Sequence, residues 1–442
     1  MKYFLLIPCL FALTAIAQDS IPQKNKPSLT INPAFSHQMM EPVQNLRKVN
    51  CFLKGKQEKS IVSRQLIIGA SLIAIGDYQR SNIDSKFGYL MRHPTSSNQI
   101  GNEVTEAVVH SFQLSFSGAV NNWLGAYAEM LYNPEQSFGA GTITDLNRNQ
   151  IQLRKAFVVF GNLDDFPVYG AIGKMDTPFG QTGSVNPFTN TTMWHAFGGL
   201  AYGAQIGFQK WNIDASFMAV QGGAQFRALN TPVGDTTNVP SQVNNFVADI
   251  NYSLNWGDHS KFIFGGSYMH GSVYSHAFPV NHFDPAVIIN PAWTTYARLE
   301  LGKSWILKGG YAKTLYEWPG THNPTPPLNI YPAAKVSSLD AGIRYLLKPD
   351  NKVAYAFSGE FSNFRAGANG SPWERQNQII LGFSAEFEKS SRLFMEVFRT
   401  DGFVPLNWLS GSEPFAPFPP GVTPSERDAF SHGIVIGALI TL

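Results

Sequence analysis

The amino-acid sequence predicts an all-β protein, a transmembrane antiparallel β-barrel of about 16 strands with both chain ends on the periplasmic side. Apolar and polar residues alternate with a period of two from residue 65 to Leu442, which is typical of strands with one face in lipid. Charged residues make up only 14% of the chain and aromatic residues 13%, whereas about a quarter of the residues of an ordinary soluble protein are charged. No apolar run is long enough for a helix that crosses a bilayer, so a closed barrel is the remaining way to span one.

Three parts follow along the chain. Residues 1–17 read as a signal peptide, because Lys2 precedes an apolar run that ends at a small-x-small cleavage site, Ala15–Ile16–Ala17. Residues 18–64 are polar and irregular, and we expect a partly disordered periplasmic N-terminal extension; a small plug, or a helix at the barrel mouth or on peptidoglycan, stays open as the alternative. Residues 65–442 form the barrel.

The strands follow from the alternation and from the links between them. Short links near residues 121, 161, 210, 257, 302, 348 and 389 alternate with long ones, as in barrels with short periplasmic turns and long outer loops. An even number of strands returns the chain to the side where it started. The predicted strands are 66–78, 106–120, 123–132, 151–160, 168–175, 201–209, 213–220, 246–256, 261–270, 293–301, 305–314, 336–347, 353–364, 377–387, 393–399 and 433–442.

The hairpin 151–175 shows the pattern most clearly. In its first strand the alternation assigns one face to Ile151, Leu153, Phe157 and Val159, and the other face to Gln152, Arg154 and Ala156. A turn with Gly161, Asn162 and two aspartates joins this strand to the second.

The last strand and the strand ends predict the location. An apolar residue stands at every second place from Ile434 to Leu442, and aromatic residues such as Trp123 and Trp256 lie at strand ends, where interface girdles form. We therefore expect the outer membrane of a Gram-negative bacterium, with outer-membrane lipid, lipopolysaccharide and the barrel assembly machinery as partners. A soluble propeller or sandwich lacks support, because no repeat of propeller length occurs.

Composition excludes other classes of partner and linkage. The formal net charge is +2, which gives no reason to expect a nucleic-acid partner. Without residues 1–17, Cys51 is the one cysteine left, so no internal disulfide is expected. Whether the barrel is a monomer or an oligomer stays open.

The lumen of such a barrel is too wide for side chains to fill, so we expect water in it and ionisable residues on its wall. These charges are of both signs and predict no strong anion or cation filter. Lys174, beside the exit of the hairpin, is the wall charge to test first. The inward-facing ionisable residues are expected to be Arg154, Lys174, Asp214, Asp249, Arg298, Glu300, Lys308, Asp340, Arg344, Glu360, Glu386 and Glu396, of which Arg154, Lys174, Arg298, Arg344 and Glu360 are candidate solute-binding residues.

The irregular segment 176–200 is the candidate constriction. It is rich in aromatic and amide side chains, which suit open water poorly, and folding into the barrel would bury them. The alternative is that they cap the outer rim. Phe179, Asn186, Trp194 and His195 would present stacking faces and hydrogen-bonding groups to a solute.

The sequence predicts neither catalysis nor a metal or cofactor. His270, His276 and His282, with Asp284, are scattered in and beside an outer loop, a spacing typical of solvated histidines. Ser431 and His432 are neighbours by coincidence, since no set of nucleophile, base and acid gathers on one rim.

One stretch resembles a known family. The motif R-x-A-F-V-x-F-G-N-L-D-x-F-P followed by G-K-M-D-T-P-F-G, residues 154–180, is similar to a hairpin of the LbtU-type siderophore porin family, as is Tyr202–Gly207. The resemblance implies an outer-membrane barrel, with uptake of a ferric siderophore or of iron and without a large plug domain. Residues 18–64 are shorter than the coiled-coil extension common in that family, and no ligand residues carry over.

Three functions therefore remain as hypotheses. The first is selective uptake of a small solute, with a ferric siderophore or another iron source preferred. The second is a general diffusion porin for small polar solutes. The third is a non-transporting surface adhesin or binding protein that uses the long loops.

Overall fold

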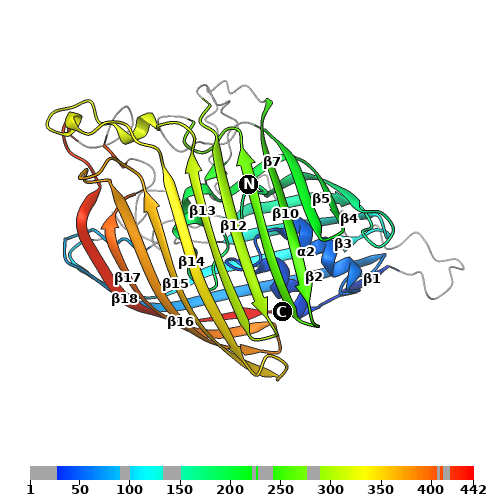
Figure 1. Ribbon diagram of the computed structural model, residues 1–442. Coiled ribbons are helices and arrows are strands. Elements are labelled where there is room, and N and C mark those ends of the chain that lie inside the picture. Colours follow the sequence, from blue (N-terminus) through cyan, green and yellow to red (C-terminus); the bar gives the residue numbers. More distant parts are fainter. Residues whose placement is uncertain are drawn as a thin grey trace, which may run out of the picture.

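A computed structural model of the chain describes residues 27–89, 100–132, 151–221, 225–226, 242–275, 289–405, 409–411 and 419–442. Within these residues one sheet of 18 strands closes on itself (Figure 1). Two of its strands are short, β1 (Ser28–Thr30) and β9 (Gln225–Phe226), and the other sixteen form the barrel wall. None of the described helices is long and apolar enough to cross a membrane.

The sixteen wall strands agree with the predicted ones to within a few residues at most ends. The largest differences are at the last two strands, which each extend further toward the long-loop end than the alternation alone predicts. The wall strands are β2 (Gln65–Ser81), β3 (Glu103–Ala119), β4 (Leu124–Tyr132), β5 (Ile151–Phe160), β6 (Val168–Asp176), β7 (Gly199–Lys210), β8 (Ile213–Gln221), β10 (Val243–Trp256), β11 (Ser260–Met269), β12 (Ala292–Leu301), β13 (Trp305–Thr314), β14 (Ser337–Leu347), β15 (Val353–Arg365), β16 (Arg375–Phe387), β17 (Ser391–Phe403) and β18 (Glu426–Thr441).

Every wall strand pairs antiparallel with its neighbours in the chain, and β18 closes the ring on β2. Closure leaves no wall edge with unpaired backbone groups, which a strand in hydrocarbon requires. Outward-facing apolar residues cover the outside, among them Ile172, Ile250 and Leu381, each more than half exposed. The same face of β18 carries Ile436 and Ile440, as its alternation predicts.

The predicted faces of β5 are wrong for half of the strand. A β-bulge in β5 shifts the register of its pairing with β4. Lys155 is opposite Glu129 and Leu153 is opposite Met130, so Arg154 is the extra residue between them. The bulge reverses the alternation: Leu153 points outward, whereas Phe157 and Val159 are buried in the lumen. In the sequence the bulge shows as two adjacent charged residues, Arg154 and Lys155, which are both buried and interrupt the alternation.

The lumen is not filled by water alone, contrary to expectation. Residues 27–64 begin with β1, which pairs with the start of β2 in the sheet, and continue into the barrel as helix α1 (Pro33–Met40) and helix α2 (Lys48–Gln57), drawn in blue inside the wall in Figure 1. This corrects the expected disordered extension for the described part of residues 18–64. The alternative of a small plug matches the arrangement, and we call residues 27–64 the plug.

The plug folds from ordinary helix signals. Asn32 accepts a hydrogen bond from the backbone N–H of Phe35 and Pro33 occupies the first turn, so α1 begins there. The two helices pack closely because Gly55 lacks a side chain where the Phe35 ring lies; a Cβ there would be 2.3 Å from a ring carbon. Phe52 is fully buried against the wall at Gly125.

The plug occupies the short-turn end of the lumen. Lys56 donates hydrogen bonds to the carbonyls of Asn122 and Gly161, both in short turns, and His37 contacts Thr441 near the C-terminus. Since short turns are periplasmic in outer-membrane barrels, the plug lies on the periplasmic side.

Three loops pack together at the opposite, outer end. The Trp373 indole donates a hydrogen bond of 2.8 Å to the Thr321 carbonyl, and Asn323 donates one of 2.7 Å to the Ser410 carbonyl, so three outer loops are joined. Trp318 and Trp373 are buried between them. One cluster of buried apolar residues runs from this outer cap to Phe52 in the plug.

Candidate functional site

Two segments cross the lumen and bind each other. The first is the link between the helices with the start of α2, residues 41–50; the second is the loop between β6 and β7, residues 177–198, which contains helix α3 (Thr192–Phe197). The Ser184 amide donates a hydrogen bond of 2.8 Å to the Val43 carbonyl, and Gln44 donates one of 3.0 Å to the Asn186 carbonyl. We call these two segments the lumen partition.

Glu360 of β15 holds the loop from the far wall. Its carboxylate accepts hydrogen bonds from the Ser184 hydroxyl at 2.9 Å, the Val185 amide at 3.0 Å and the Asn186 side chain at 3.2 Å. The residue is buried. Several donors on one buried carboxylate make strong, directional contacts, so this part of the loop is fixed.

Glu396 of β17 holds the next part of the loop in the same way. It accepts from the amides of Phe188 at 2.8 Å and Thr189 at 3.0 Å, from the Thr189 hydroxyl, and from the Tyr89 hydroxyl at 3.2 Å. Glu396 is fully buried. The loop thus enters from β6 and is bound to the wall across the lumen.

Arg47 joins the plug to the wall and to the loop. Its guanidinium donates to Asp249 of β10 at 2.8 Å and to the Gly180 carbonyl at 2.9 Å. Asp249 is buried and also accepts from Ser267 and Tyr296. One side chain therefore connects three separate segments.

Glu41 is a second connection between plug and wall. Its carboxylate lies 3.1 Å from Arg392 of β17 and 3.5 Å from His37, and it accepts from the Val43 amide. Burial by itself raises the pKa of the Glu41 carboxyl, but Arg392, His37 and Lys48 outweigh burial and hold its pKa below the ordinary 4.5. Burial lowers the pKa of Lys48 to about 8, with the nearby Lys155 acting in the same direction.

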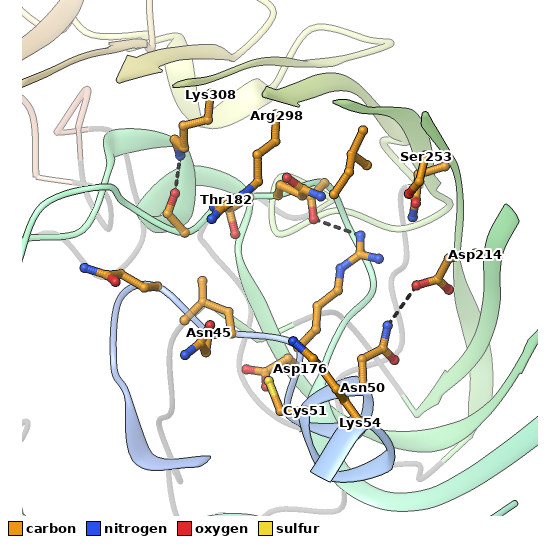
Figure 2. Close-up of a pocket in the computed structure, with 18 of the residues that line it drawn as sticks. Asn45, Asn50, Cys51, Lys54, Asp176, Thr182, Asp214, Ser253, Arg298 and Lys308 are labelled. Atoms are coloured by element: carbon orange, nitrogen blue, oxygen red, sulfur yellow. Dashed lines mark hydrogen bonds between the residues drawn. The ribbon is translucent and has the colours of Figure 1, made fainter. Parts of the chain in front are cut away.

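A cavity of about 560 Å³ remains beside the partition (Figure 2). One side of the cavity is formed by Asn50, Cys51 and Lys54 of α2, and another by the loop from Phe179 to Val185. The opposite wall comes from β8 and from β10 to β14. Lining residues next to the short turns show that it extends toward the periplasmic end. Its polar lining and its size suit one small polar solute.

Four of the nine predicted site residues line this cavity. Phe179 and Trp194 belong to the loop, and Arg298 and Arg344 to the wall. Arg344 donates to the Gln44 side chain at 2.7 Å and pairs with Glu386. The loop 177–198 therefore enters the barrel, as the sequence predicts. A role of these four residues in binding a solute stays a prediction.

The remaining five predicted residues lie elsewhere. Asn186 and Glu360 bind each other and fix the loop, and His195 is buried with its ring edge-on to Trp194. Arg154 makes a buried ion pair of 3.1 Å with Glu129, away from the cavity.

Lys174, the wall charge singled out in the sequence, does not line the cavity. Its side chain is fully buried, and it is opposite Tyr202 on β7. Its amine donates to the Leu153 carbonyl at 3.1 Å. A role for Lys174 in binding a solute stays a prediction.

The sequence also missed functional residues of the plug, above all Glu41, Arg47 and Asn50. One signal could have found them: lumen-facing positions of β4 to β6 carry Tyr127, Phe157, Val159, Tyr169 and Ala171, all buried. A water-filled lumen has no use for so many apolar side chains on its inner wall.

The described residues hold no group of three or more His, Cys, Asp or Glu side chains that could bind a metal ion. His276, His282 and Asp284 lie outside the described residues. Ser431 contacts Thr400, and His432 stacks near Phe430, so the two do not form a catalytic pair.

No family model matches the sequence. A protein of Coxiella burnetii described as a UPF0422 protein is 30% identical over 95 residues, which is 20% of this chain and only 19% of the length of that curated relative.

Solved structures cover far more of the chain. The anion-selective porin from Comamonas acidovorans superimposes with a TM-score of 0.50 over 85% of this chain and 99% of that one, at 11% identity. The outer-membrane channel DcaP of Acinetobacter baumannii reaches 0.48 at 11% identity, over 85% and 97%, and OprB of Pseudomonas putida 0.48 at 8%, over 85% and 94%. Identities this low concern the fold alone. The chain is a porin-type barrel of sixteen strands, a fold of the Gram-negative outer membrane.

Proposed function

We propose that the protein is an outer-membrane channel for selective uptake of one class of small solute. The observation that carries the proposal is the lumen partition. Plug and loop are bonded to each other and to opposite walls, and they leave a cavity of about 560 Å³ where an open pore would run. A barrel obstructed in this way suits binding and gated passage better than free diffusion.

A ferric siderophore is the preferred solute, with another iron source next. Support comes from the resemblance of residues 154–180 and Tyr202–Gly207 to the LbtU-type siderophore porin family. The volume of the cavity is in the range of pockets that bind small molecules, roughly 300–1,000 Å³. The plug of residues 27–64 is small, in keeping with a family that lacks a large plug domain.

Two other functions compete. A general diffusion porin has the same wall, but the lumen partition does not suit free diffusion. An adhesin or binding protein would use the outer loops and need no passage. The proposal includes no enzymatic activity and no cofactor.

Conductance of the purified protein in planar bilayers tests the proposal. We expect small, infrequent channel events that a ferric siderophore suppresses at micromolar concentration, and no suppression by the iron-free solute. The double variant Glu360→Gln and Glu396→Gln, which weakens the loop contacts, should show larger events that the siderophore blocks less well.

The outcomes separate the three functions. Large, steady conductance that no siderophore affects would favour the general porin. A barrel that stays closed even when residues 18–64 are deleted and the loop is released would favour the adhesin. Because deletion of the loop could prevent folding, the glutamate variants serve as the milder perturbation.

A further inference from the structure

The lining of the cavity carries an excess of positive charge. Acidic side chains at its surface are Asp176, Asp214 and Glu300. Seven cationic side chains face them. Among the described residues these cations fall into two groups, according to what already holds them.

Three cations hold the lumen partition in place, Arg47 from within it and Lys308 and Arg344 from the wall. Arg47 pairs with Asp249, Lys308 with Asp340 and the Gly183 carbonyl, and Arg344 with Glu386. Asp249 and Asp340 are buried and Glu386 is partly buried, so each charge is matched, and the main role of these cations is to fix the plug and the loop.

The other four cations have no such matching. Lys54, Lys210, Lys261 and Arg298 line the cavity, and in the described part of the chain none of them pairs with a buried carboxylate. Lys54 lies 3.5 Å from Glu58, with both side chains at least half exposed, a geometry that contributes little. Lys210 lies over the Trp211 ring.

Arg298 has the geometry of an anion-binding residue. Its Nε donates to Glu300 at 2.7 Å, so the ion pair uses the inner nitrogen of the guanidinium. Its side chain makes no second hydrogen bond or ion pair with the described residues, so its two terminal amino groups are left for a solute in the cavity that Arg298 lines. Those groups form the fork that binds carboxylate or phosphate side-on. Figure 2 shows Arg298 on the wall opposite Cys51 and Lys54 of α2.

From this arrangement we infer that the cavity is a binding site for an anionic, oxygen-rich solute, with Arg298 and Lys261 on the wall and Lys54 on the plug as its charged contacts. Asn50, Ser253 and Asn255 add hydrogen-bonding groups around the same space. The inference deepens the proposed function and rests on it, because it states the charge class of the solute that the channel takes up.

Cation-lined walls with a low dielectric around them concentrate anions and repel cations. A solute that carries several carboxylate or other anionic oxygens would therefore gain at this site, whereas a neutral or cationic solute of equal size would not. The plug supplies part of the lining, so the site exists only while the plug is in place.

Cys51 permits a direct test, because its thiol lies in the lining of the cavity. The purified full-length chain is treated with an anionic and with a cationic methanethiosulfonate reagent of similar size. Each rate is divided by the rate for 2-mercaptoethanol in the same buffer. Burial raises the pKa of the Cys51 thiol and slows both reactions alike, so the ratio of the two reports the local potential.

We expect the anionic reagent to react faster with Cys51 than the cationic one. The ratio of the two normalised rates should fall about threefold or more in Arg298→Gln, and further when Lys261→Gln is added. Lys352→Gln removes a charge from an exposed turn outside the cavity and should change nothing. Cys51→Ser gives the background. In addition, citrate should slow labelling by the neutral reagent N-ethylmaleimide more than potassium chloride of equal ionic strength does.

A ratio near one, a preference for the cationic reagent, or a ratio that Arg298→Gln leaves unchanged overturns the inference. If Cys51 reacts too slowly to measure, Asn255→Cys in the Cys51→Ser background places the thiol at the exposed rim of the same cavity and is read in the same way. The readout does not require conductance. Absence of conductance together with a clear preference for the anionic reagent would therefore refute the channel and support the anion site. Conductance that a ferric siderophore blocks, without a preference for the anionic reagent, would support the channel and refute the anion site.

Discussion

Arg47 is the residue on which the lumen partition depends most. It pairs with the buried Asp249 and also donates to the Gly180 carbonyl, so plug, wall and loop meet at one guanidinium. Removing one partner of a buried ion pair typically costs about 3–5 kcal/mol, since the other charge is left without compensation. We expect Arg47→Gln to loosen the partition and to raise bilayer conductance severalfold.

Arg399 provides the matched control for Arg47. It also pairs with an aspartate, Asp401, at 2.9 Å, but both side chains are at least 40% exposed. An exposed pair of this kind contributes at most about 1 kcal/mol. Arg399→Gln should leave conductance as it is; equal effects of both substitutions would show that Arg47 does not hold the partition.

Glu41 makes the position of the plug sensitive to acid. Its pKa in the folded protein lies below the ordinary value of 4.5, so the ion pair with Arg392 stabilises the plug fully above that value. The contribution begins to fall below pH 4.5 and is lost as the pH drops through the folded pKa. Hydrogen exchange of α1 and α2 should therefore increase in this acidic window.

Glu41→Gln is the test of the acid response. The variant should exchange faster than the natural chain at neutral pH, because Arg392 loses its partner, and should lack the acid-dependent increase that Glu41 causes. If the natural chain and Glu41→Gln respond to acid in the same way, another carboxylate controls the plug.

At the level of elements, the wall could be predicted and the plug could not. Alternation and short turns specify sixteen strands because each wall residue faces either lipid or lumen. The bulge at Arg154 breaks that rule, so that Phe157 and Val159 lie on the lumen face of β5 instead of the outer one. The helices of the plug are short and depend on packing in the lumen rather than on their own propensity, which local sequence cannot show.

The cavity, like the plug, is formed by residues far apart in the sequence, and this limits how much of the site can be predicted. Arg298 and Arg344 could be chosen because they are charged residues on inward-facing positions of strands. Arg47 and Lys54 could not, since nothing near them in the sequence shows that residues 27–64 return into the barrel. Apolar residues on the inner face, such as Tyr127 and Tyr169, were the available sign.

Gly125 tests whether the plug sits on the wall as described. A Cβ at this position would lie 2.5 Å from the Phe52 ring, so Gly125→Val should push α2 off β4 while keeping a residue that suits a strand. We expect faster proteolysis within residues 48–64 and a higher conductance. Gly118→Val is the control, because a Cβ at Gly118 meets nothing closer than 3.7 Å.

Gly125→Val could also fail to fold, and heat-modifiable migration on gels distinguishes that case. A folded Gly125→Val barrel with the proteolysis pattern and conductance of the natural protein would mean that Phe52 does not anchor the plug on this part of the wall.

For the whole molecule, two sets of contacts cross or border the lumen. Three outer loops join through Trp373 and Asn323, and the partition lies below them, held by Arg47, Glu360 and Glu396. One apolar cluster includes residues of both levels, so outer loops and plug belong to the same packed interior.

The wall does not need the plug for closure. β18 and β2 are paired from Ser431 opposite Ser81 to Thr441 opposite Ser71, whereas the plug adds to the sheet only β1, beside the start of β2. Deleting residues 18–64 should give a folded barrel with severalfold higher conductance. Its melting temperature should fall, because Phe157, Tyr127 and Tyr169 lose the apolar cover of α2 and face water.

Deleting only residues 18–26, which leaves both helices in place, is the matched control and should conduct like the natural chain. Bilayer recordings and thermal melts of the two deletion variants together test whether residues 27–64 obstruct the lumen and stabilise the barrel. A barrel without residues 18–64 that conducts no better than the natural protein would show that the loop 177–198 closes the lumen alone. Since the loop is bound to Glu360 and Glu396 independently of the plug, adding Glu360→Gln and Glu396→Gln to that deletion would then have to open it.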